Sequence, residues 1–239
     1  MVSGRYCVVI PAFDAERTIG DAVRRAKEQG LPVVVVNDGS RDQTAAIASQ
    51  HGALVISHLR NQGKGAALRT GFEYATRMRY DGVVTMDGDG QHDPAEIRQL
   101  LEAAEKQQAF VVVGNRMWDG AVMPRARLWT NRIMSRVVSA AAGCPIPDSQ
   151  CGFRVIRREV LEAVPLDARR FEIETEMLLK TAARRWKIVS VPIKSIYSGH
   201  RSHIRPVREG VRFLALVLRH SLQRRGAGRG ASAGAARDV

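Results

Sequence analysis

The sequence predicts an α/β fold built on a single, mostly parallel sheet flanked by helices. Short apolar runs rich in valine and isoleucine alternate with segments in which apolar residues recur at helical spacing. Strands separated by helices pair in parallel, with both faces of the sheet covered. The chain has 239 residues, of which 45% are apolar, and this suits one large domain with a substantial core. No apolar run approaches the roughly 20 residues that a membrane-spanning helix requires.

The alternation places the elements in order along the chain. Strands are expected at 5–10, 32–36, 53–57, 82–86, 109–113 and 188–192. Helices are expected at 16–29, 41–51, 64–79, 94–107, 125–142, 157–163, 173–185 and 206–222. The first apolar run ends at Pro11 and is too short for the core of a signal peptide.

Polar turns follow four of these strands directly. The turns start at Pro11, Asn37, Asn61 and Asp87. In open parallel sheets, ligands bind outside the carboxyl ends of the strands. We therefore expect the four turns to form one site.

The turn after the fourth strand carries two carboxylates one residue apart, Asp87 and Asp89. Unpaired carboxylates at such spacing repel each other, so a cation between them is expected. Oxygen ligands favour Mg²⁺ or Mn²⁺, and Gln91 adds an amide oxygen two residues further on. The sequence therefore predicts a divalent metal site at Asp87, Asp89 and Gln91.

Other interpretations of this turn fail at particular residues. A calcium-binding EF-hand loop needs Gly and Glu where His92 and Arg98 stand. A phosphoaspartyl phosphatase pattern has Thr or Val in place of Gln91. Asp93 is interpreted as the cap of the helix that opens at Pro94.

Two further turns carry candidates for phosphate and base recognition. The segment 61–65 (Asn-Gln-Gly-Lys-Gly) opens a helix, where backbone N–H groups attract anions and Lys64 adds a charge. It is not a P-loop, because Gly65 replaces the required Ser or Thr, and an ordinary glycine-rich helix start explains it equally well. Asn37 and Asp38 could pair with a nucleobase or ribose, although a turn and helix cap is the simpler interpretation of either alone.

The motifs together are far more specific than any one of them. In order they read 10–13 (Ile-Pro-Ala-Phe), 36–42 (Val-Asn-Asp-Gly-Ser-Arg-Asp), 61–65, 87–91 (Asp-Gly-Asp-Gly-Gln), 114–116 (Gly-Asn-Arg) and 148–154 (Asp-Ser-Gln-Cys-Gly-Phe-Arg). This set resembles glycosyltransferase family 2, especially the branch with dolichol-phosphate mannose synthase and bacterial polyprenyl-phosphate sugar transferases. The resemblance covers roughly residues 5–205. It implies a GT-A fold with a Rossmann-like sheet, a nucleotide-sugar donor, a divalent metal and inversion at the sugar carbon.

The resemblance also implies roles for individual residues. Those expected to line the nucleoside pocket are Pro11, Phe13, Asn37 and Asp38. Lys64 is expected near the donor, while Asp87, Asp89 and Gln91 hold the metal and diphosphate. Arg116 and Arg154 match positions that face the acceptor or the transferred group. One departure from the family is Asn37 in place of the first of two aspartates, which favours a UDP-sugar over GDP-mannose because Asn offers both an acceptor and a donor to uracil.

The acceptor decides whether a general base is needed. A hydroxyl acceptor needs one, and Asp148 is the first candidate; the acidic segment 171–176 supplies others, with Glu172 and Glu176 one helical turn apart. An acidic helix start explains that segment equally well. A phosphate acceptor needs no base, because its second pKa of about 6 leaves it largely dianionic at neutral pH. The branch of the resemblance favours a polyprenyl phosphate; a saccharide hydroxyl is the alternative.

Two rival functions come from other classes of protein. A sugar-phosphate nucleotidyltransferase would carry a glycine-rich loop with Arg and Lys after the first strand, and 11–14 (Pro-Ala-Phe-Asp) is not one. The net charge of +13 raises the possibility of a nucleic-acid-binding module. Aromatic residues make up only 5% of the chain and show no interleaved stacking pattern, so nucleic acid is not the expected partner.

The C-terminal part of the chain concentrates basic charge. Nine arginines follow position 200, opposed only by Glu209 and Asp238. We divide the chain into a glycosyltransferase domain at 1–205, a basic amphipathic helix at 206–225 and a disordered tail at 226–239. A basic amphipathic helix can lie on an anionic membrane, although packing on the domain is a common alternative. Three cysteines without metal-ligand spacing favour a reduced cytoplasmic setting, with peripheral contact at the inner face of the membrane. The sequence gives no indication of oligomeric state.

Overall fold

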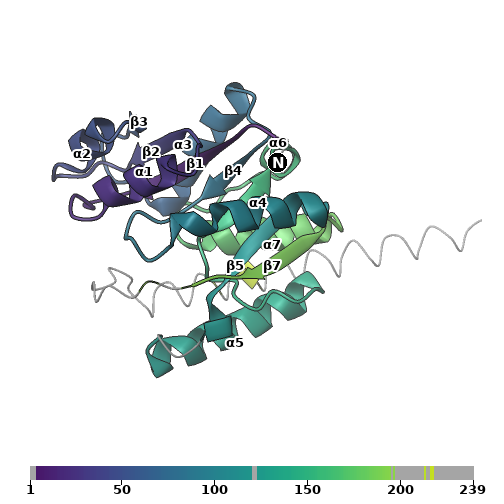
Figure 1. Cartoon of the computed structure of the whole chain (residues 1–239). Helices are drawn as coiled ribbons and strands as arrows, with labels where there is room; N and C mark the ends of the chain where they lie inside the picture. Colours follow the sequence, from purple (N-terminus) through teal and green to yellow (C-terminus); the bar gives the residue numbers. More distant parts are fainter. Residues whose placement is uncertain (1–3, 120–122, 195, 197–212, 214–215, 218–239) are drawn as a thin grey trace, which may run out of the picture.

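A seven-stranded sheet in the order β3-β2-β1-β4-β6-β5-β7 forms the centre of the computed structural model (Figure 1). The structure describes residues 4–119, 123–194, 196, 213, 216 and 217. The parallel strands are β1 (Tyr6–Ala12), β2 (Val33–Asn37), β3 (Leu54–Ser57), β4 (Gly82–Thr85), β5 (Val111–Asn115) and β7 (Ile188–Pro192). Strand β6 (Arg154–Arg157) runs antiparallel between β4 and β5.

Helices cover both faces of this sheet. They are α1 (Ile19–Lys27), α2 (Thr44–Gln50), α3 (Lys64–Arg77), α4 (Ile97–Lys106), α5 (Arg125–Ala142), α6 (Arg158–Ala163) and α7 (Glu172–Ala183), with 3₁₀ turns η1 (Pro94–Glu96) and η2 (Arg116–Asp119). Helix α3 packs on β1 and touches α6 and α7, whereas α4 lies on the opposite face against β5 and β7 (Figure 1). Helix α5 lies at the outside of the domain and packs against α7.

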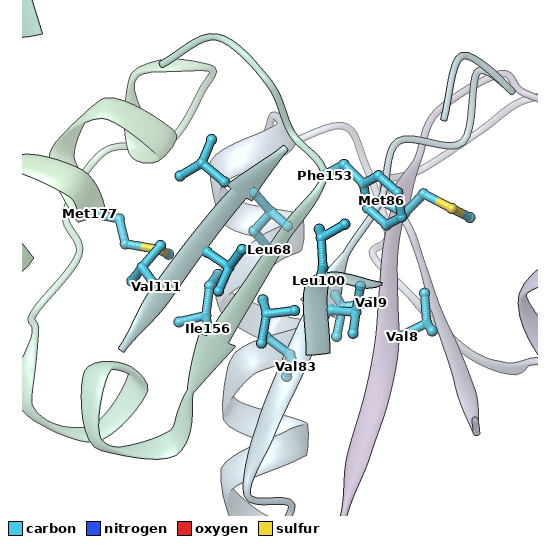
Figure 2. Close-up of a cluster of buried hydrophobic side chains, with 14 of the residues drawn as sticks. Val8, Val9, Leu68, Val83, Met86, Leu100, Val111, Phe153, Ile156 and Met177 are labelled. Atoms are coloured by element: carbon cyan, nitrogen blue, oxygen red, sulfur yellow. The ribbon is translucent and has the colours of Figure 1, made fainter. Parts of the chain in front are cut away.

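The central strands are buried and rich in valine and isoleucine. All of β2 and β4 is buried, and in β1 only Pro11 is partly exposed, as expected for parallel strands covered on both faces. Figure 2 shows the core that these strands form with α3, α4 and α7. Its labelled side chains are Val8, Val9, Leu68, Val83, Met86, Leu100, Val111, Phe153, Ile156 and Met177.

The predicted α/β sheet and its six strands are confirmed, with ends that shift by at most two residues. Three helical predictions need correction: the first helix begins at Ile19 rather than residue 16, the second begins at Thr44 rather than residue 41, and the segment 94–107 divides into η1 and α4. Strand β6 was not predicted. It has only four residues and an arginine at each end, so it lacks the length and pattern that identify a strand.

The predicted C-terminal helix falls largely outside the described residues, as does the whole tail at 226–239. Within the helix, Phe213 and Val217 are buried and join the core cluster. The boundaries at 205 and 225 therefore stay a prediction. Among the described residues, no helix is both long and apolar enough to cross a bilayer.

Candidate active site

The parallel strands bring their carboxyl ends to one edge of the sheet, and the reversed strand β6 brings its amino end there too. Register aligns the neighbouring strand ends, because Ala12 pairs with Asn37 and Asn37 with Ser57. The loops that leave β1, β2, β4 and β5 therefore meet the loop that enters β6. This edge is where the sequence placed the site.

An ion-pair cluster lies at the centre of this edge. The Nζ atom of Lys64 is 2.6 Å from Oδ1 of Asp87 and 3.1 Å from Oε1 of Glu174. The backbone of Gly152 lies directly on the cluster, since a Cβ atom there would come within 2.8 Å of Oδ2 of Asp87 and 2.9 Å of Oε1 of Glu174. The ring of Phe171 lies 5.7 Å from Nζ of Lys64. Helices α3 and α7 and the turn after β4 thus converge on one lysine.

The cluster determines which of its members carry charge. Burial lowers the pKa of Lys64, but the carboxylates of Asp87 and Glu174 outweigh it and hold the pKa above its ordinary value. Burial raises the pKa of Asp87, but Lys64 and His92 outweigh that effect and lower it to about 2. Lys64 is therefore an ammonium and Asp87 a carboxylate at neutral pH.

The ion pairs of Lys64 join it to Asp87 and Glu174, and Asp89 is in a different environment. Its Oδ1 atom accepts the backbone N–H of Gln91 at 3.0 Å. Burial raises the pKa of Asp89, and the neighbouring charge of Asp87 raises it further. Asp89 is thus a partly buried carboxylate, and the positive charges of Lys64 and Arg127 do not fully offset burial and the repulsion from Asp87.

These residues fit a divalent metal whose coordination shell is completed by oxygen atoms of the substrate. The donors are hard oxygens, and a cation would relieve the repulsion between Asp87 and Asp89. No group of three or more His, Cys, Asp or Glu side chains is placed to hold a metal among the described residues. Magnesium sites of one or two carboxylates plus substrate phosphates are common. Gln91, the third predicted ligand, is partly buried beside Asp89.

His92 hydrogen-bonds to the backbone of the turn that carries Asp87. Its Nδ1 atom accepts the backbone N–H of Asp87 at 3.2 Å, and its ring stacks on Phe153 at 5.2 Å. Burial lowers the pKa of His92 to about 4, so the ring is neutral at pH 7. A neutral ring is also what the contact requires, because Nδ1 must be unprotonated to accept.

The residues predicted to line the nucleoside pocket differ in how far they are buried. Asn37 and Asp38 are buried and engaged by protein groups. The amide of Asn37 accepts the N–H of Ser40 and donates to Oγ of Ser57. Each end of the amide keeps a second hydrogen-bonding site, so the role of Asn37 in the nucleoside pocket stays a prediction.

Asp38 organises the loop before α3. Its carboxylate accepts the backbone N–H groups of Gln62 and Gly63 at 2.9 and 2.7 Å and contacts Nδ1 of His58 at 2.7 Å. The N–H of Ala66 is also shared with the carbonyl of Arg169. Protein groups therefore bind the loop before α3 and the N–H of Ala66, and the interpretation of 61–65 as an anion-binding helix start stays a prediction.

Pro11 and Phe13 remain at the rim of the edge. Pro11 is partly buried, and the ring of Phe13 is 44% exposed, so it is able to stack on a planar ligand. The loop that carries Phe13 is bound to its neighbours: Thr18 Oγ1 donates to the carbonyl of Gly88, and the N–H of Asp14 donates to Oγ of Ser40. The loops after β1, β2 and β4 thus form one connected rim.

Arg116 and Asp148 form a buried pair. The Nε and Nη2 atoms of Arg116 donate to the carboxylate of Asp148 at 2.8 and 3.0 Å, and its backbone N–H donates to the same carboxylate at 3.1 Å. The side chain of Asp148 is 0% exposed. The pair closes the end of β5 onto the loop before β6, and it leaves Asp148 poorly placed as a general base.

Arg154 is likewise directed into the protein. Its guanidinium donates to the carbonyls of Cys151, Ser149 and Glu174 at 2.8, 2.8 and 2.6 Å. These contacts account for its burial and connect the entering loop of β6 to α7. These contacts give Arg154 a supporting role in the loop, and its role at the acceptor stays a prediction.

The glutamates of the acidic segment 171–176 differ in the contacts that they make. Glu176 accepts the N–H groups of Asp167 and Ala168 and pairs with Lys180 at 2.7 Å, so it holds the loop before α7. Glu172 lies on the same side of the helix as Glu176. Its Oε2 atom is buried and has no hydrogen-bond partner among the described residues.

Sequence reasoning included Glu174 only as part of the acidic segment 171–176 and did not predict its contact with Lys64. Spacing along the helix drew attention to Glu172 and Glu176, and nothing local distinguishes the residue between them. His92 was considered only as a mismatch to a calcium loop. Its position one residue after Gln91 was the available signal, since a histidine beside an acidic turn often supports that turn.

The mostly parallel sheet is covered by helices on both faces, and its carboxyl edge carries an acidic pair, a lysine and an exposed aromatic ring. This arrangement is typical of nucleotide-dependent transferases. The sequence matches Glycosyl transferase family 2 over residues 7–164. The chain belongs to glycosyl transferase family 2 and is a glycosyltransferase.

Two curated relatives share most of their length with this chain. The UDP-N-acetylglucosamine–dolichyl-phosphate N-acetylglucosaminyltransferase of Methanococcus voltae is 28% identical over 214 residues, covering 80% of this chain and 85% of that protein. The polyprenol monophosphomannose synthase of Mycolicibacterium smegmatis is 29% identical over 204 residues, covering 79% and 76%. Both belong to the branch that the sequence motifs indicated.

Solved structures confirm the GT-A fold. Glucosyl-3-phosphoglycerate synthase from Mycobacterium tuberculosis, in complex with Mn²⁺, UDP and phosphoglyceric acid, superposes with a TM-score of 0.73 at 21% identity, covering 92% of this chain and 79% of that one. At this identity the likeness concerns the fold.

Proposed function

We propose that this glycosyltransferase moves a sugar from a nucleotide-sugar, preferably a UDP-sugar, to the phosphate of a polyprenyl phosphate. The relatives named above act on dolichyl phosphate or make polyprenol monophosphomannose, which supports a lipid-phosphate acceptor. One structural observation carries the choice of phosphate over hydroxyl. Asp148, the first candidate for a general base, is buried in its pair with Arg116.

Two further carboxylates at the edge are also engaged. Glu174 is paired with Lys64, and Glu176 accepts two backbone N–H groups. A hydroxyl nucleophile needs a group that takes its proton. A phosphate monoester at neutral pH already carries the charge to attack, so a site whose first candidate base is held in an ion pair suits it.

The proposed reaction is a single displacement. An oxygen of the acceptor phosphate forms a bond to the anomeric carbon, while the bond from that carbon to the donor diphosphate breaks. The nucleoside diphosphate leaves with the electron pair, and the configuration of the sugar carbon inverts. No proton has to move in this step.

The residues of the cluster meet the charge that develops on the leaving group. Lys64 stays protonated beside Asp87 and contributes positive charge close to the diphosphate. Asp87, Asp89 and Gln91 would hold Mg²⁺ or Mn²⁺. When bound, the metal adds positive charge at the diphosphate. Phe13 would stack on the base, and Pro11 and Asn37 would shape its pocket.

A transfer panel tests this proposal. Purified protein is given UDP- and GDP-sugars with Mg²⁺ or Mn²⁺, and either a polyprenyl phosphate in detergent or soluble saccharides. We expect transfer to the lipid phosphate, and we expect an excess of chelator to stop it. Efficient transfer to a saccharide hydroxyl without transfer to the lipid phosphate would reject the proposed acceptor.

A hydroxyl-directed transferase is the second candidate, and Glu172 is the observation that favours it. Its Oε2 atom is buried without a hydrogen-bond partner among the described residues. Replacement by glutamine separates the two functions. For a phosphate acceptor, Glu172→Gln should change turnover little, whereas Glu174→Gln should lower it by disturbing Lys64. The reverse order would identify Glu172 as the base.

A further inference from the structure

The outer face of α5 has a reversed pattern of polarity in its first half. Trp129 and Ile133 lie one turn apart and are 60% and 54% exposed. Asn131 and Ser135 are buried instead. A helix on a globular domain normally turns apolar residues inward and polar residues to water.

The buried polar residues have partners that explain their orientation. Oγ of Ser135 accepts the N–H of Ser149 at 2.9 Å and lies 3.2 Å from its hydroxyl. The amide of Asn131 contacts Sδ of Met123 at 3.7 Å. The helix is therefore held in this rotation by specific contacts, and the exposure of Trp129 and Ile133 follows from them.

Basic residues flank the exposed apolar pair. Arg125, Arg132 and Arg136 are exposed, and at 3.6 residues per turn they fall on one stripe that adjoins Trp129. The sequence of α5 contains no acidic residue. A second tryptophan, Trp118 in η2, is 77% exposed on the segment that leads toward α5.

We propose that this face of α5, formed by Trp129, Ile133 and the stripe of Arg125, Arg132 and Arg136, docks on the surface of an anionic lipid bilayer. Tryptophan favours the level of lipid headgroups, and a helix with arginines beside an apolar strip lies in the interface plane. The positive stripe complements anionic headgroups. A symmetric contact with a second copy would instead place the arginine stripes against each other, where like charges repel.

Docking through α5 would hold the active site close to a membrane-embedded acceptor, an inference that rests on the proposed lipid-phosphate acceptor. Ser135 is bonded to Ser149, and Asp148 beside it holds Arg116 at the site. The loop that enters β6 thus connects α5 to the edge of the sheet that carries Lys64. The C-terminal segment is a weaker candidate for docking, because Phe213 and Val217 are buried in the core.

Vesicle binding by the full chain tests the docking face. The double variant Trp129→Ser, Ile133→Ser removes apolar contact, and Arg132→Glu, Arg136→Glu reverses the charge. Each should lower the partition coefficient on phosphatidylglycerol vesicles by roughly tenfold or more, with little binding of any form to phosphatidylcholine. The matched control is Arg77→Glu, Met78→Ser, an exposed pair at the far end of α3, which should bind as the wild type does.

Tryptophan fluorescence locates the contact. Trp118→Phe, Trp186→Phe leaves Trp129 as the single tryptophan of the chain. Its emission should shift to shorter wavelength on anionic vesicles and be quenched by brominated lipids. If the protein binds while this emission stays unchanged, another surface docks and the proposal is wrong.

Two further outcomes would also overturn it. The α5 variants could abolish self-association and leave vesicle binding intact, which would make a second copy the occupant. Removal of residues 218–239 could abolish vesicle binding while the α5 variants retain it, which would assign docking to the C-terminal segment.

A water-soluble, short-chain prenyl phosphate separates this proposal from the proposed function. The α5 variants should transfer sugar to it at the wild-type rate and fail selectively on polyprenyl phosphate embedded in vesicles. If the wild type uses neither acceptor, the proposed function is wrong, and the vesicle and fluorescence results still decide the docking face.

Discussion

Lys64 lies 2.6 Å from Asp87 and neutralises the carboxylate that the sequence assigns to a metal. The contact joins the first residue of α3 to the turn after β4. In the free protein, therefore, a positive charge already occupies part of the space around the acidic pair. Donor and metal must bind in the presence of that charge.

Replacement of Lys64 by methionine should separate metal affinity from turnover. Without the ammonium, Mn²⁺ should bind the free protein roughly tenfold more tightly, because a like charge no longer opposes it. Turnover should fall roughly 100-fold, since the leaving group loses a preorganised charge. Calorimetric Mn²⁺ titration and a transfer assay measure the two effects. Lys106→Met, which removes an exposed lysine from α4, is the control; weaker Mn²⁺ binding by Lys64→Met would contradict the prediction.

Asp89→Ala should abolish turnover and leave the metal-free fold intact. The ionised side chain is opposed by burial and by Asp87, so its removal should not destabilise the protein in chelator. Chemical unfolding and a transfer assay with Mg²⁺ or Mn²⁺ check both statements. Retained activity would rule out the proposed metal site.

Asp38→Ala should act on stability. It leaves the N–H groups of Gln62 and Gly63 without their acceptor, and loss of a buried, charged acceptor costs about 3 kcal/mol. Asp21→Ala on α1 breaks only an exposed pair with Arg24 and should cost less than about 1 kcal/mol. Urea unfolding of the two variants gives the comparison, and equal costs would show that Asp38 does not hold the loop.

His92 should make the metal-free protein sensitive to acid. Its folded pKa of about 4 lies below its ordinary value of 6.5, so the unfolded chain binds the proton more readily. The stability is fully present above pH 6.5 and is lost as the pH falls through 4, by about 3 kcal/mol in total.

The variant His92→Asn isolates this effect, because an amide oxygen can accept the same N–H of Asp87. Its free energy of unfolding, measured in chelator, should depend less on pH between 7 and 4 than that of the wild type. Parallel curves for the two proteins would show that His92 is not held neutral by burial.

UDP should protect the protein against thermal unfolding more than GDP at equal concentration with Mn²⁺. The smaller base suits a pocket whose Asn37 is already bonded to Ser40 and Ser57, and ligand binding to the native state raises its melting temperature. Phe13→Ser should reduce the protection if the ring stacks on the base. Equal shifts with both nucleotides would remove the preference for a UDP-sugar.

The sequence was sufficient for the sheet and for the edge that carries the site. Valine-rich runs such as that of β2 have one stable location, a sheet covered on both faces, and parallel strands place their following turns together. The sequence alone therefore places Asp87, Asp89 and Lys64 at the same edge of the sheet.

The orientation of buried side chains could not be predicted. A sequence does not show that the guanidinium of Arg154 donates to three backbone carbonyls. Asp148 looked like a base because its pairing with Arg116, which spans 32 residues, is also not visible in the sequence. Glu174 was overlooked because its contact with Lys64 depends on how α7 is set against α3.

The reversed strand β6 determines the order in which the sheet can be completed during synthesis. β5 leaves the ribosome before β6, yet β6 separates it from β4 in the finished sheet. Until residues 154–157 emerge, one edge of β4 is unpaired, and β5 is the nearest strand able to occupy it. An open edge of this kind invites wrong pairing and attracts chaperones. A nascent chain that stalls within α5 is therefore the form of this protein most exposed to misfolding.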